Sequence, residues 1–441
     1  TAKDGKTLVY YIATADVTRS DVAVYANYKD NIGTPWGMAR VQDQMDSAKA
    51  RHSDPEQPEL YIPNYTPVVG VNADFYNMTN GAPSGALVME GVEYHGGGSE
   101  NFFAILKDGT PIIGGPSDYA AYKDNIAEAV GGSIMLVQDG KIVVTSSSNY
   151  YDSRASRTCV GITADNRVVL MVMDGRQEPV SAGGSAIEIA QVMLEAGCVV
   201  AMNLDGGGST TFVAKEEGEN ELSVVNRPSD GYARSVSSSL MVVSTARPSD
   251  EFDHAIVSAD YDYLTVGTSL SITATGVSAS GNAAKLPEAA SLRVSDSSIG
   301  SISDGVFTAS AVGSVQVQVV ADGKVLGSKT LHVVVPTALK FGKESVNAIY
   351  GVPVDLPLTA VYNGNQVAVN TGDVVLGFVE NGQAVLESKA GKINGLTFTG
   401  DESSGIRTVT IGAALLKNGQ PELSSAVMLT VYLYKDRKSV V

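Results

Sequence analysis

The chain has 441 residues, a length that exceeds a single hydrophobic core and predicts several domains. Its 44% hydrophobic and 18% charged residues are typical of folded globular proteins and exclude disorder. Lys and Arg number 31 and Asp and Glu number 48, so the net charge is −17. This charge repels phosphate backbones and anionic membrane surfaces, and it excludes nucleic acid as a partner. No apolar run is long enough to predict a membrane span.

The chain ends and the two cysteines leave the cellular compartment open. Residues 1–5 contain no apolar signal-peptide core, and such a start is typical of a mature or trimmed chain. The charged residues 435–438 near the other end are typical of a cut from a longer protein. Cys159 and Cys198 are compatible with a disulfide or with two buried free thiols, and the thiols are the simpler interpretation.

Two patterns in the first half predict a helix and a hairpin. Apolar residues at helical spacing predict a helix over residues 38–50, with its apolar stripe in the core. Residues 157–163 and 167–173 are apolar runs separated by a turn through residues 165–166, which predicts two paired strands.

A second helix and a buried strand follow in sequence. Ser185 and Glu188 match a capping box at the start of a helix, and Gly197 is expected to end that helix. The unbroken apolar run over residues 198–204 predicts a buried strand. For residues 1–248 we therefore expect an α+β domain with a mixed or largely antiparallel sheet.

The composition changes near residues 245–255, and short alternating strands separated by polar turns follow. Residues 251–335 resemble bacterial Ig-like domains, on the strength of residues 264–267 (LTVG), 303–309 (SDGVFTA) and 311–313 (AVG). Residues 336–441 predict a second β-sandwich, which is also expected to be Ig-like. The predicted architecture is thus one α+β domain followed by two all-β sandwiches.

The most informative loop lies directly after the buried strand and reads Asp205, Gly206, Gly207, Gly208. Three consecutive glycines favour close backbone approach or positive φ, and successive N–H groups can form an anion-binding nest. Asp205 could then act as nucleophile, base or cation ligand. The alternative is a tight turn closed by the Asp205 side chain, and spacing alone favours that alternative. No Lys-Ser or Lys-Thr follows, so the loop is not a P-loop.

Six blocks in order resemble the phosphodiester glycosidase family. They are residues 72–76 (NADFY), 157–161 (RTCVG), 174–176 (DGR), 188–190 (EIA), 203–210 (NLDGGGST) and 226–231 (NRPSDG), the last followed by 234–236 (RSV). The resemblance implies hydrolysis of a sugar-1-phosphodiester at the anomeric carbon, with an N-acetylglucosamine-1-phosphodiester as the type of substrate. The first block departs from the Gly-rich NGGFF or NSGFY of many members, which leaves the identity of the sugar open.

The resemblance also implies which residues form the site. The implied catalytic residues are Asp205, Asp174 and Glu188. The implied substrate-binding residues are Asn72, Asp74, Arg157, Thr158, Asn203, Gly206, Gly207, Gly208, Ser209, Thr210, Arg227 and Arg234. A phosphate leaving group needs little protonation, so the site must hold the phosphate and place a carboxylate at the anomeric carbon. We assign the phosphate to Arg157, the glycine amides and the two hydroxyls, with Arg234 assisting, and the carboxylate to Asp205 ahead of Asp174.

Several of these residues have an equally simple structural interpretation. Glu188 is as well explained by the capping box as by the pocket, and Asp74 could simply end a strand. Arg227 is better explained as a surface residue that packs on Pro228. Arg157 could form a structural ion pair with Asp174 or with Asp152.

Other functional classes fit less well. The two histidines of the first half lie outside any Ser-His-Asp setting, and no zinc-binding motif is present. No cofactor is required, although the carboxylate excess leaves a divalent cation such as calcium open. The remaining alternative is a non-catalytic, glycan-binding surface or adhesion protein built on the same domain. Either interpretation predicts an extracellular or cell-surface protein with a phosphorylated glycan as its ligand, associated with the cell wall through flanking regions.

Overall fold

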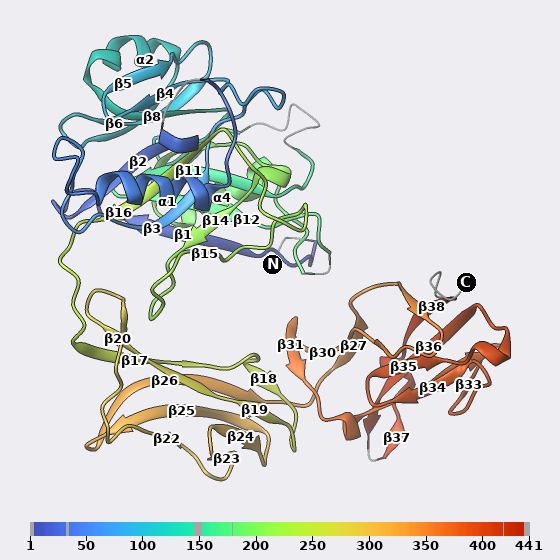
Figure 1. The fold of residues 1–441 in the computed structure, drawn as a ribbon. Helices are drawn as coiled ribbons and strands as arrows, with labels where there is room; N and C mark the ends of the chain where they lie inside the picture. The colour runs from blue at the N-terminus through green and yellow to red at the C-terminus, as the bar shows by residue number, and fades with distance from the viewer. Residues whose placement is uncertain (1–3, 32–34, 145–151, 179, 418, 436–441) are drawn as a thin grey trace. The chain divides into compact units, whose positions relative to one another are not determined.

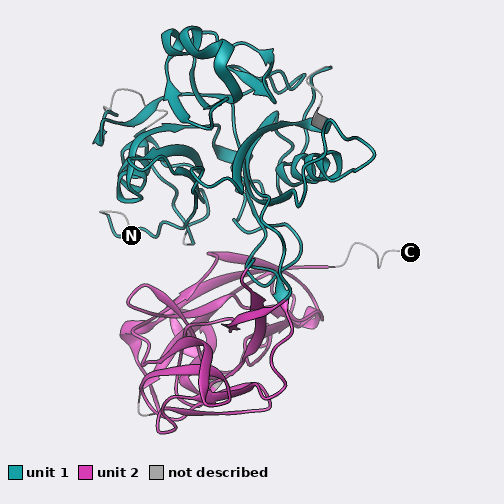
Figure 2. Ribbon diagram, turned by 90° about the vertical axis from the view of Figure 1, so that its left-hand side faces the viewer, with its two compact units in different colours: residues 1–250, 280–283 teal, residues 251–279, 284–441 magenta. Residues whose placement is uncertain are grey.

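The computed structural model describes residues 4–31, 35–144, 152–178, 180–417 and 419–435. Most of the charged segment at residues 435–438 lies outside these ranges. The chain divides into two compact units, residues 1–250 with 280–283, and residues 251–279 with 284–441 (Figure 2). In the described residues, no helix has the length and apolar character needed to cross a membrane.

Within its described residues, the first unit contains three sheets and a small number of helices (Figure 1). One sheet has the order β1 (Tyr10–Ala15), β12 (Val168–Met173), β11 (Arg157–Thr163), β13 (Cys198–Asn203), β9 (Met135–Gln138), β10 (Lys141–Ile142). The second has the order β15 (Ser223–Val224), β14 (Phe212–Ala214), β3 (Thr66–Asn72), β16 (Ser238–Ser244), β2 (Val22–Tyr28). The third has the order β5 (Val92–His95), β4 (Leu87–Met89), β8 (Ile126–Gly132), β6 (Asn101–Leu106), β7 (Pro111–Gly114). The helices are α1 (Val41–His52), α2 (Pro116–Tyr122) and α4 (Ala186–Glu195), with 3-10 turns η1 (Lys29–Asn31), η2 (Lys123–Asn125) and η3 (Gly207–Ser209).

The strand pairs described within these three sheets are antiparallel, which confirms the predicted fold class. The predicted hairpin is β11 and β12, and Asn166 in its turn has a φ of 62°. The helix predicted over residues 38–50 is α1, shifted by a few residues. The capping box at Ser185 is formed, and Gly197 follows the helix with a φ of 87°.

Packing of the first two sheets explains the long apolar runs of their strands. One core cluster joins the facing surfaces of the two sheets, including Val160 and Leu170 from one and Val71 and Leu240 from the other. Helix α4 packs on the outer surface of the sheet that contains β11 and β13, in a second hydrophobic cluster. Helix α1 packs on the outer surface of the sheet that contains β3 and β16, in a third cluster. Strands β11, β12 and β13 are therefore covered on both faces, and the long apolar runs in these strands fit that burial.

The cysteines lie in this packed region. Cys159 and Cys198 are both buried and free, so the interpretation as two thiols holds in the structure. Burial raises the pKa of Cys198 to about 12, and it raises the pKa of Cys159 further. Neither thiol is therefore a reactive nucleophile at neutral pH.

The second unit is built from strands, with the 3-10 turns η4 (Thr371–Asp373), η5 (Glu402–Ser404) and η6 (Leu423–Ser425). Its sheets have the orders β17-β20-β21, β22-β25-β26-β18-β31-β30-β27, β19-β24-β23, β28-β38-β36-β32-β33 and β29-β35-β34, and β37 pairs with β36. The strands up to residue 333 are β17 (Phe252–Ser258), β18 (Tyr263–Leu264), β19 (Ser269–Ser271), β20 (Thr273–Ser278), β21 (Ala283–Ala284), β22 (Ser291–Val294), β23 (Gly300–Ser303), β24 (Val306–Ala309), β25 (Gly313–Ala321) and β26 (Lys324–Val333). The later strands are β27 (Ala338–Phe341), β28 (Ser345–Ile349), β29 (Val354–Asp355), β30 (Leu358–Tyr362), β31 (Asn365–Ala368), β32 (Val374–Glu380), β33 (Gln383–Val385), β34 (Gly391–Asn394), β35 (Thr397–Gly400), β36 (Thr408–Lys417), β37 (Gln420–Pro421) and β38 (Val427–Tyr434).

Two hydrophobic clusters lie within this unit. One draws on residues from Ala255 to Val333, together with Ala368, and the other on residues from Val334 to Leu433. Strand β18 pairs in parallel with both β26 and β31, so one sheet continues across the predicted boundary at residues 335–336. The division into two separate Ig-like sandwiches at that boundary stays a prediction.

Candidate functional site

Three strand ends meet at the glycine loop through a single buried side chain. Asn72 closes β3, and its Nδ2 donates to the carbonyl of Asp205 at 2.7 Å. Its Oδ1 accepts the Thr158 hydroxyl at 2.8 Å and the main-chain N–H of Thr211 at 3.1 Å. Asn72 and Thr158 have no exposed surface. The side chain of Asn72 therefore holds β3, β11 and the loop after β13 together.

The glycine loop forms a tight turn that presses against the start of β11. Gly207, with a φ of 62°, opens the 3-10 turn η3, and its N–H donates to the carbonyl of Ser156 at 2.8 Å. A Cβ on Gly206 would come within 2.8 Å of that same carbonyl oxygen. The glycines thus permit close backbone approach. The predicted tight turn is present, and the amide of Gly207 is already used inside the protein.

Asp205 stands at the entrance of this turn and is partly exposed. Burial raises the pKa of Asp205 to about 6, against the opposing effects of the Ser209 hydroxyl, the Gly206 N–H and the charge of Arg234. Ser209 is buried, and the buried Thr210 lies 3.5 Å from the Thr158 hydroxyl. Asp205 therefore has a raised pKa and is accessible to a ligand.

Two guanidinium groups lie over the glycines. Arg234 pairs with Asp230 through Nε and Nη2 at 2.9 and 2.6 Å, and its Nη1 lies 3.5 Å from the Ser209 hydroxyl. The exposed Arg176 has a φ of 59°, and its Nη1 would lie 3.7 Å from a Cβ on Gly207. Sequence reasoning gave Arg176 no role, although the DGR block contained it.

Gly208 offers a direct test of the Arg234 position. A Cβ there would lie 2.1 Å from Nη2 of Arg234 and 2.4 Å from Oδ2 of Asp230, so a methyl group must displace the ion pair. Because both clashing groups end flexible side chains, we expect Gly208→Ala to change the unfolding free energy by only about 1 kcal/mol. We expect the same variant to weaken binding of a sugar-1-phosphodiester about tenfold or more, since it moves a charged donor. Calorimetric titration checks this. Unchanged affinity would remove Arg234 from the binding site.

Arg157 and Asp174 lie behind the loop and bind main-chain groups. Arg157 is 2% exposed, and it donates from Nε to the carbonyl of Gly184 at 3.1 Å and from Nη2 to that of Ser153 at 2.9 Å. Asp174 is also 2% exposed and accepts the side-chain amide of Asn226 at 2.9 Å. Burial raises the pKa of Asp174, opposed by its hydrogen bonds. In this geometry Arg157 and Asp174 shape the wall of the site.

The segment around Asn226 connects Asp174 to the glycine loop. The N–H of Arg227 donates to both carboxylate oxygens of Asp174, at 3.1 and 3.0 Å. The amide of Asn226 also lies 3.3 Å from the carbonyl of Thr210. The side chain of Arg227 is exposed. Asp174 is thereby brought next to the loop, as predicted from the sequence, while its oxygens are occupied.

Glu188 completes the capping box at the start of α4. Its Oε2 accepts the N–H of Ser185 at 3.0 Å, and its Oε1 lies 2.5 Å from Nη2 of Arg154. Both oxygens are therefore used, which favours the structural interpretation of this residue over a catalytic one.

Replacement of Glu188 separates the two interpretations. We expect Glu188→Ala to lower the unfolding free energy by about 1 kcal/mol while leaving kcat near that of the wild type. Glu195→Ala, at the exposed end of the same helix, serves as the control. A hundredfold loss of kcat in a folded Glu188 variant would restore the catalytic assignment.

Two predicted residues carry buried oxygens without a partner in the described part of the chain. Asp74 is 2% exposed, and its Oδ2 accepts the N–H of Gly85 at 2.6 Å while its Oδ1 has no hydrogen-bond partner. Asn203 donates from Nδ2 to the hydroxyl of Ser133 at 3.0 Å, and its Oδ1 likewise has no partner. In the same described ranges, no group of three or more His, Cys, Asp or Glu side chains is placed to hold a metal ion.

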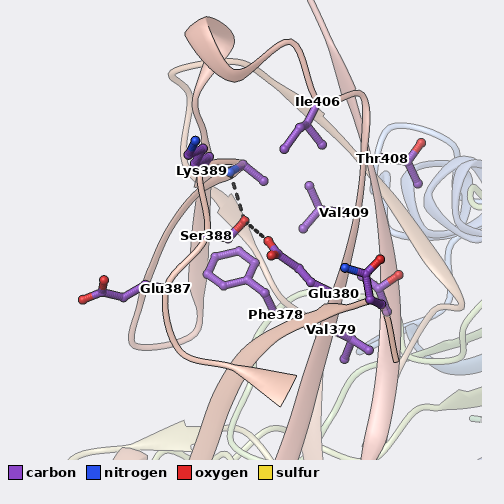
Figure 3. A pocket seen from close by; sticks show the side chains of 12 residues that line it. Phe378, Val379, Glu380, Glu387, Ser388, Lys389, Ile406, Thr408 and Val409 are labelled. Atoms are coloured by element: carbon purple, nitrogen blue, oxygen red, sulfur yellow. Dashed lines mark hydrogen bonds between the residues drawn. The ribbon is translucent and has the colours of Figure 1, made fainter. Parts of the chain in front are cut away.

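A cavity in the second unit is a less suitable site. It has a volume of about 730 Å³, and Phe378, Ile406 and Val409 line it together with polar residues (Figure 3). The Ser388 hydroxyl donates to Glu380 at 2.6 Å and accepts the N–H of Ala390 at 3.0 Å. Ser388, Glu380 and the N–H of Ala390 are hydrogen-bonded to one another. The loops of the first unit therefore remain the better candidate for the functional site.

Comparison with known proteins matches residues 65–243 to the family described as phosphodiester glycosidase. This part of the chain is similar to that family. The match contains every predicted site residue, from Asn72 to Arg234, so the matched segment and the site coincide.

Proteins similar to this segment include the N-acetylglucosamine-1-phosphodiester alpha-N-acetylglucosaminidases of mouse and human. They are 28% and 29% identical over 163 residues, which is 33% of this chain and 31% of theirs. The uncharacterized prophage protein YomE of Bacillus subtilis is 28% identical over 196 residues, 42% of this chain and 29% of its own. The catalytic domain of the zebrafish N-acetylglucosaminidase is similar in structure, with 20% identity, a TM-score of 0.41 and coverage of 56% of this chain and 86% of that domain. The chain thus spans under a third of the length of the curated relatives it matches.

Proposed function

We propose that the first unit hydrolyses a sugar-1-phosphodiester at the anomeric carbon. The family match of residues 65–243 supports glycosidase chemistry on a phosphodiester-linked sugar. One geometric observation carries the rest of the proposal. The Nη1 of Arg234 lies 3.5 Å from the Ser209 hydroxyl at the glycine loop, and this hydroxyl and the charge of Arg234 both lower the pKa of the partly exposed Asp205. A negative group and a positive group thus lie beside each other, as the two ends of a sugar–phosphate linkage require.

The chemistry follows from the leaving group. A phosphate monoester has a second pKa near 6, so it leaves with little need for a proton. Arg234 and Ser209 bind the phosphate from one side of the glycine loop and Arg176 binds it from the other, with charge-assisted hydrogen bonds. Asp205 faces the anomeric carbon and stabilises the positive charge that develops there.

The remaining predicted residues position this centre. Asn72 and Thr158 fix the main chain of Asp205, and Asp174 fixes the segment beside Thr210. Arg157 lies near the glycine loop, since a Cβ added to Gly206 would lie 3.8 Å from its Cδ. In this proposal Arg157 donates to the main-chain carbonyls of Gly184 and Ser153, and its positive charge raises the electrostatic potential at the glycine loop.

The substrate class and location are also proposals. The named activity of the mouse and human relatives favours N-acetylglucosamine as the sugar, carried on a phosphorylated glycan or cell-surface polymer. We propose an extracellular or cell-surface location. The net charge of −17 makes the local positive groups at the loop essential for an anionic substrate.

An assay on a defined substrate tests the proposal. The full chain is incubated with UDP-N-acetylglucosamine or a chromogenic N-acetylglucosamine-1-phosphodiester, and free sugar is measured. We expect release of N-acetylglucosamine. Binding by calorimetry without release would instead favour the glycan-binding or adhesion protein.

A further inference from the structure

Asp74 and Asp205 are carried by main-chain segments that are hydrogen-bonded to each other. Asp74 lies two residues after the end of β3, and the carbonyl of its neighbour Ala73 accepts the N–H of Asp205 at 2.8 Å. The N–H of Asp74 lies 3.2 Å from the hydroxyl of Ser238 on the adjacent strand β16. The position of Asp74 relative to Asp205 is therefore fixed by sheet geometry.

The carboxyl group of Asp74 is enclosed in a space that suits a neutral group. It is 2% exposed, it receives one N–H from Gly85, and its Oδ1 has no hydrogen-bond partner in the described residues. A Cβ on Gly131 would lie 2.7 Å from Oδ2, so the surrounding main chain packs closely against it. Burial of a carboxylate with so few donors is costly, whereas a protonated carboxyl avoids that cost.

The charged groups around Asp74 act in the same direction. Asp205 and the half-buried Glu100 are both negative and both disfavour ionisation of Asp74. The nearby His95 uses Nδ1 on the carbonyl of Gly85. The cation Arg234 acts on Asp205. Burial raises the pKa of Asp74 to about 7, opposed by the N–H groups of Gly85 and Phe75 and assisted by the charges of Asp205 and Glu100.

We propose that Asp74 and Asp205 form a coupled carboxyl pair that holds one proton near neutral pH, with Asp74 as the protonated member. This inference rests on the proposed function, because it assigns Asp74 as the positioning residue of that same site. The pair then carries one negative charge instead of two, which allows an anionic phosphodiester to enter. It also keeps Asp205 as the ionised carboxylate that faces the sugar.

The pair predicts a narrow optimum of activity. Asp205 must be ionised and Asp74 protonated, so kcat/KM should rise through about pH 6 and fall above about pH 7. In Asp74→Asn the neutral amide replaces the neutral acid. We therefore expect the acidic limb to stay in place and the alkaline limb to disappear. An alkaline limb that persists unchanged in Asp74→Asn would overturn the proposal.

A second measurement needs no substrate and separates the proposal from the enzymatic function. Infrared difference spectra between the wild type and Asp74→Asn should contain the carbonyl band of one protonated carboxyl group at pH 6, and that band should titrate near pH 7. In Asp205→Asn the loss of the neighbouring charge should move this titration to lower pH, whereas Asp165→Asn should not. Absence of the band from the wild type would refute the pair. Presence of the band in a chain without turnover would retain the pair and reject the enzyme.

Discussion

Replacement of Asp205 by Asn is expected to lower kcat by roughly 10²–10⁴-fold. The amide has nearly the same shape but carries no negative charge, so it stabilises neither the developing cation nor an attacking water. Asp205 is partly exposed and its burial already disfavours the charge, so the unfolding free energy should change by only about 1 kcal/mol. Steady-state kinetics on a sugar-1-phosphodiester, together with a thermal melt, provide the measurement.

A matched control makes this result specific. Asp165 lies in the turn of the β11–β12 hairpin, where its carboxylate accepts the Thr163 hydroxyl at 2.5 Å. Asp165→Asn removes one charge from the same unit without touching the glycine loop, and it should leave kcat unchanged. If Asp205→Asn kept more than a third of the wild-type kcat, Asp205 would not be the carboxylate that acts on the sugar.

Replacement of Asn72 by Ala is expected to give the largest loss of stability. The change removes a fully buried amide that serves the Asp205 carbonyl, the Thr158 hydroxyl and the Thr211 N–H. Each buried group left without a partner costs about 1–3 kcal/mol, so a total loss of about 3–5 kcal/mol is expected. Turnover should fall as well, because the main chain of Asp205 loses its support.

The single tryptophan makes the measurement specific to the first unit. Trp36 packs edge-on against Tyr28, with ring centroids 5.6 Å apart, so its fluorescence reports unfolding of that unit in urea. Thr158→Val removes one partner of Asn72 and keeps the shape, so it should cost less, about 1–2 kcal/mol. A loss below about 1 kcal/mol in Asn72→Ala would contradict the role given to its amide.

The sequence predicted the elements whose signals are local. Ser185 and Glu188, three residues apart, predict the start of helix α4. Two apolar runs separated by a polar turn predict the β11–β12 hairpin. The third sheet, over residues 87–132, has no comparable pattern. Its buried Glu128 accepts the N–H of Ala26, 102 residues away in sequence, so the packing of this sheet depends on residues distant in sequence.

The sequence predicted which residues gather at the glycine loop, but it did not predict the contacts that each of them makes. The motif blocks place Asn72, Asp205 and Thr158 together, and the structure does bring them into contact. The hydrogen bonds of the Asn72 side chain join residues 86 to 139 positions apart in sequence. No local sequence pattern therefore shows that this amide connects the strands. Arg157 is buried and Arg176 is exposed, and no local pattern in the sequence distinguishes the two. The sequence therefore favoured Arg157 for the phosphate and gave Arg176 no role.

The most direct test of the central claim asks which bond breaks. The full chain is allowed to hydrolyse an N-acetylglucosamine-1-phosphodiester in water enriched in oxygen-18, and both products are analysed by mass spectrometry. Attack at the anomeric carbon, directed by Asp205 and the glycine loop, places the heavy oxygen on the released sugar and none on the phosphate. Heavy oxygen on the phosphate would show cleavage of the phosphorus–oxygen bond and would contradict the account.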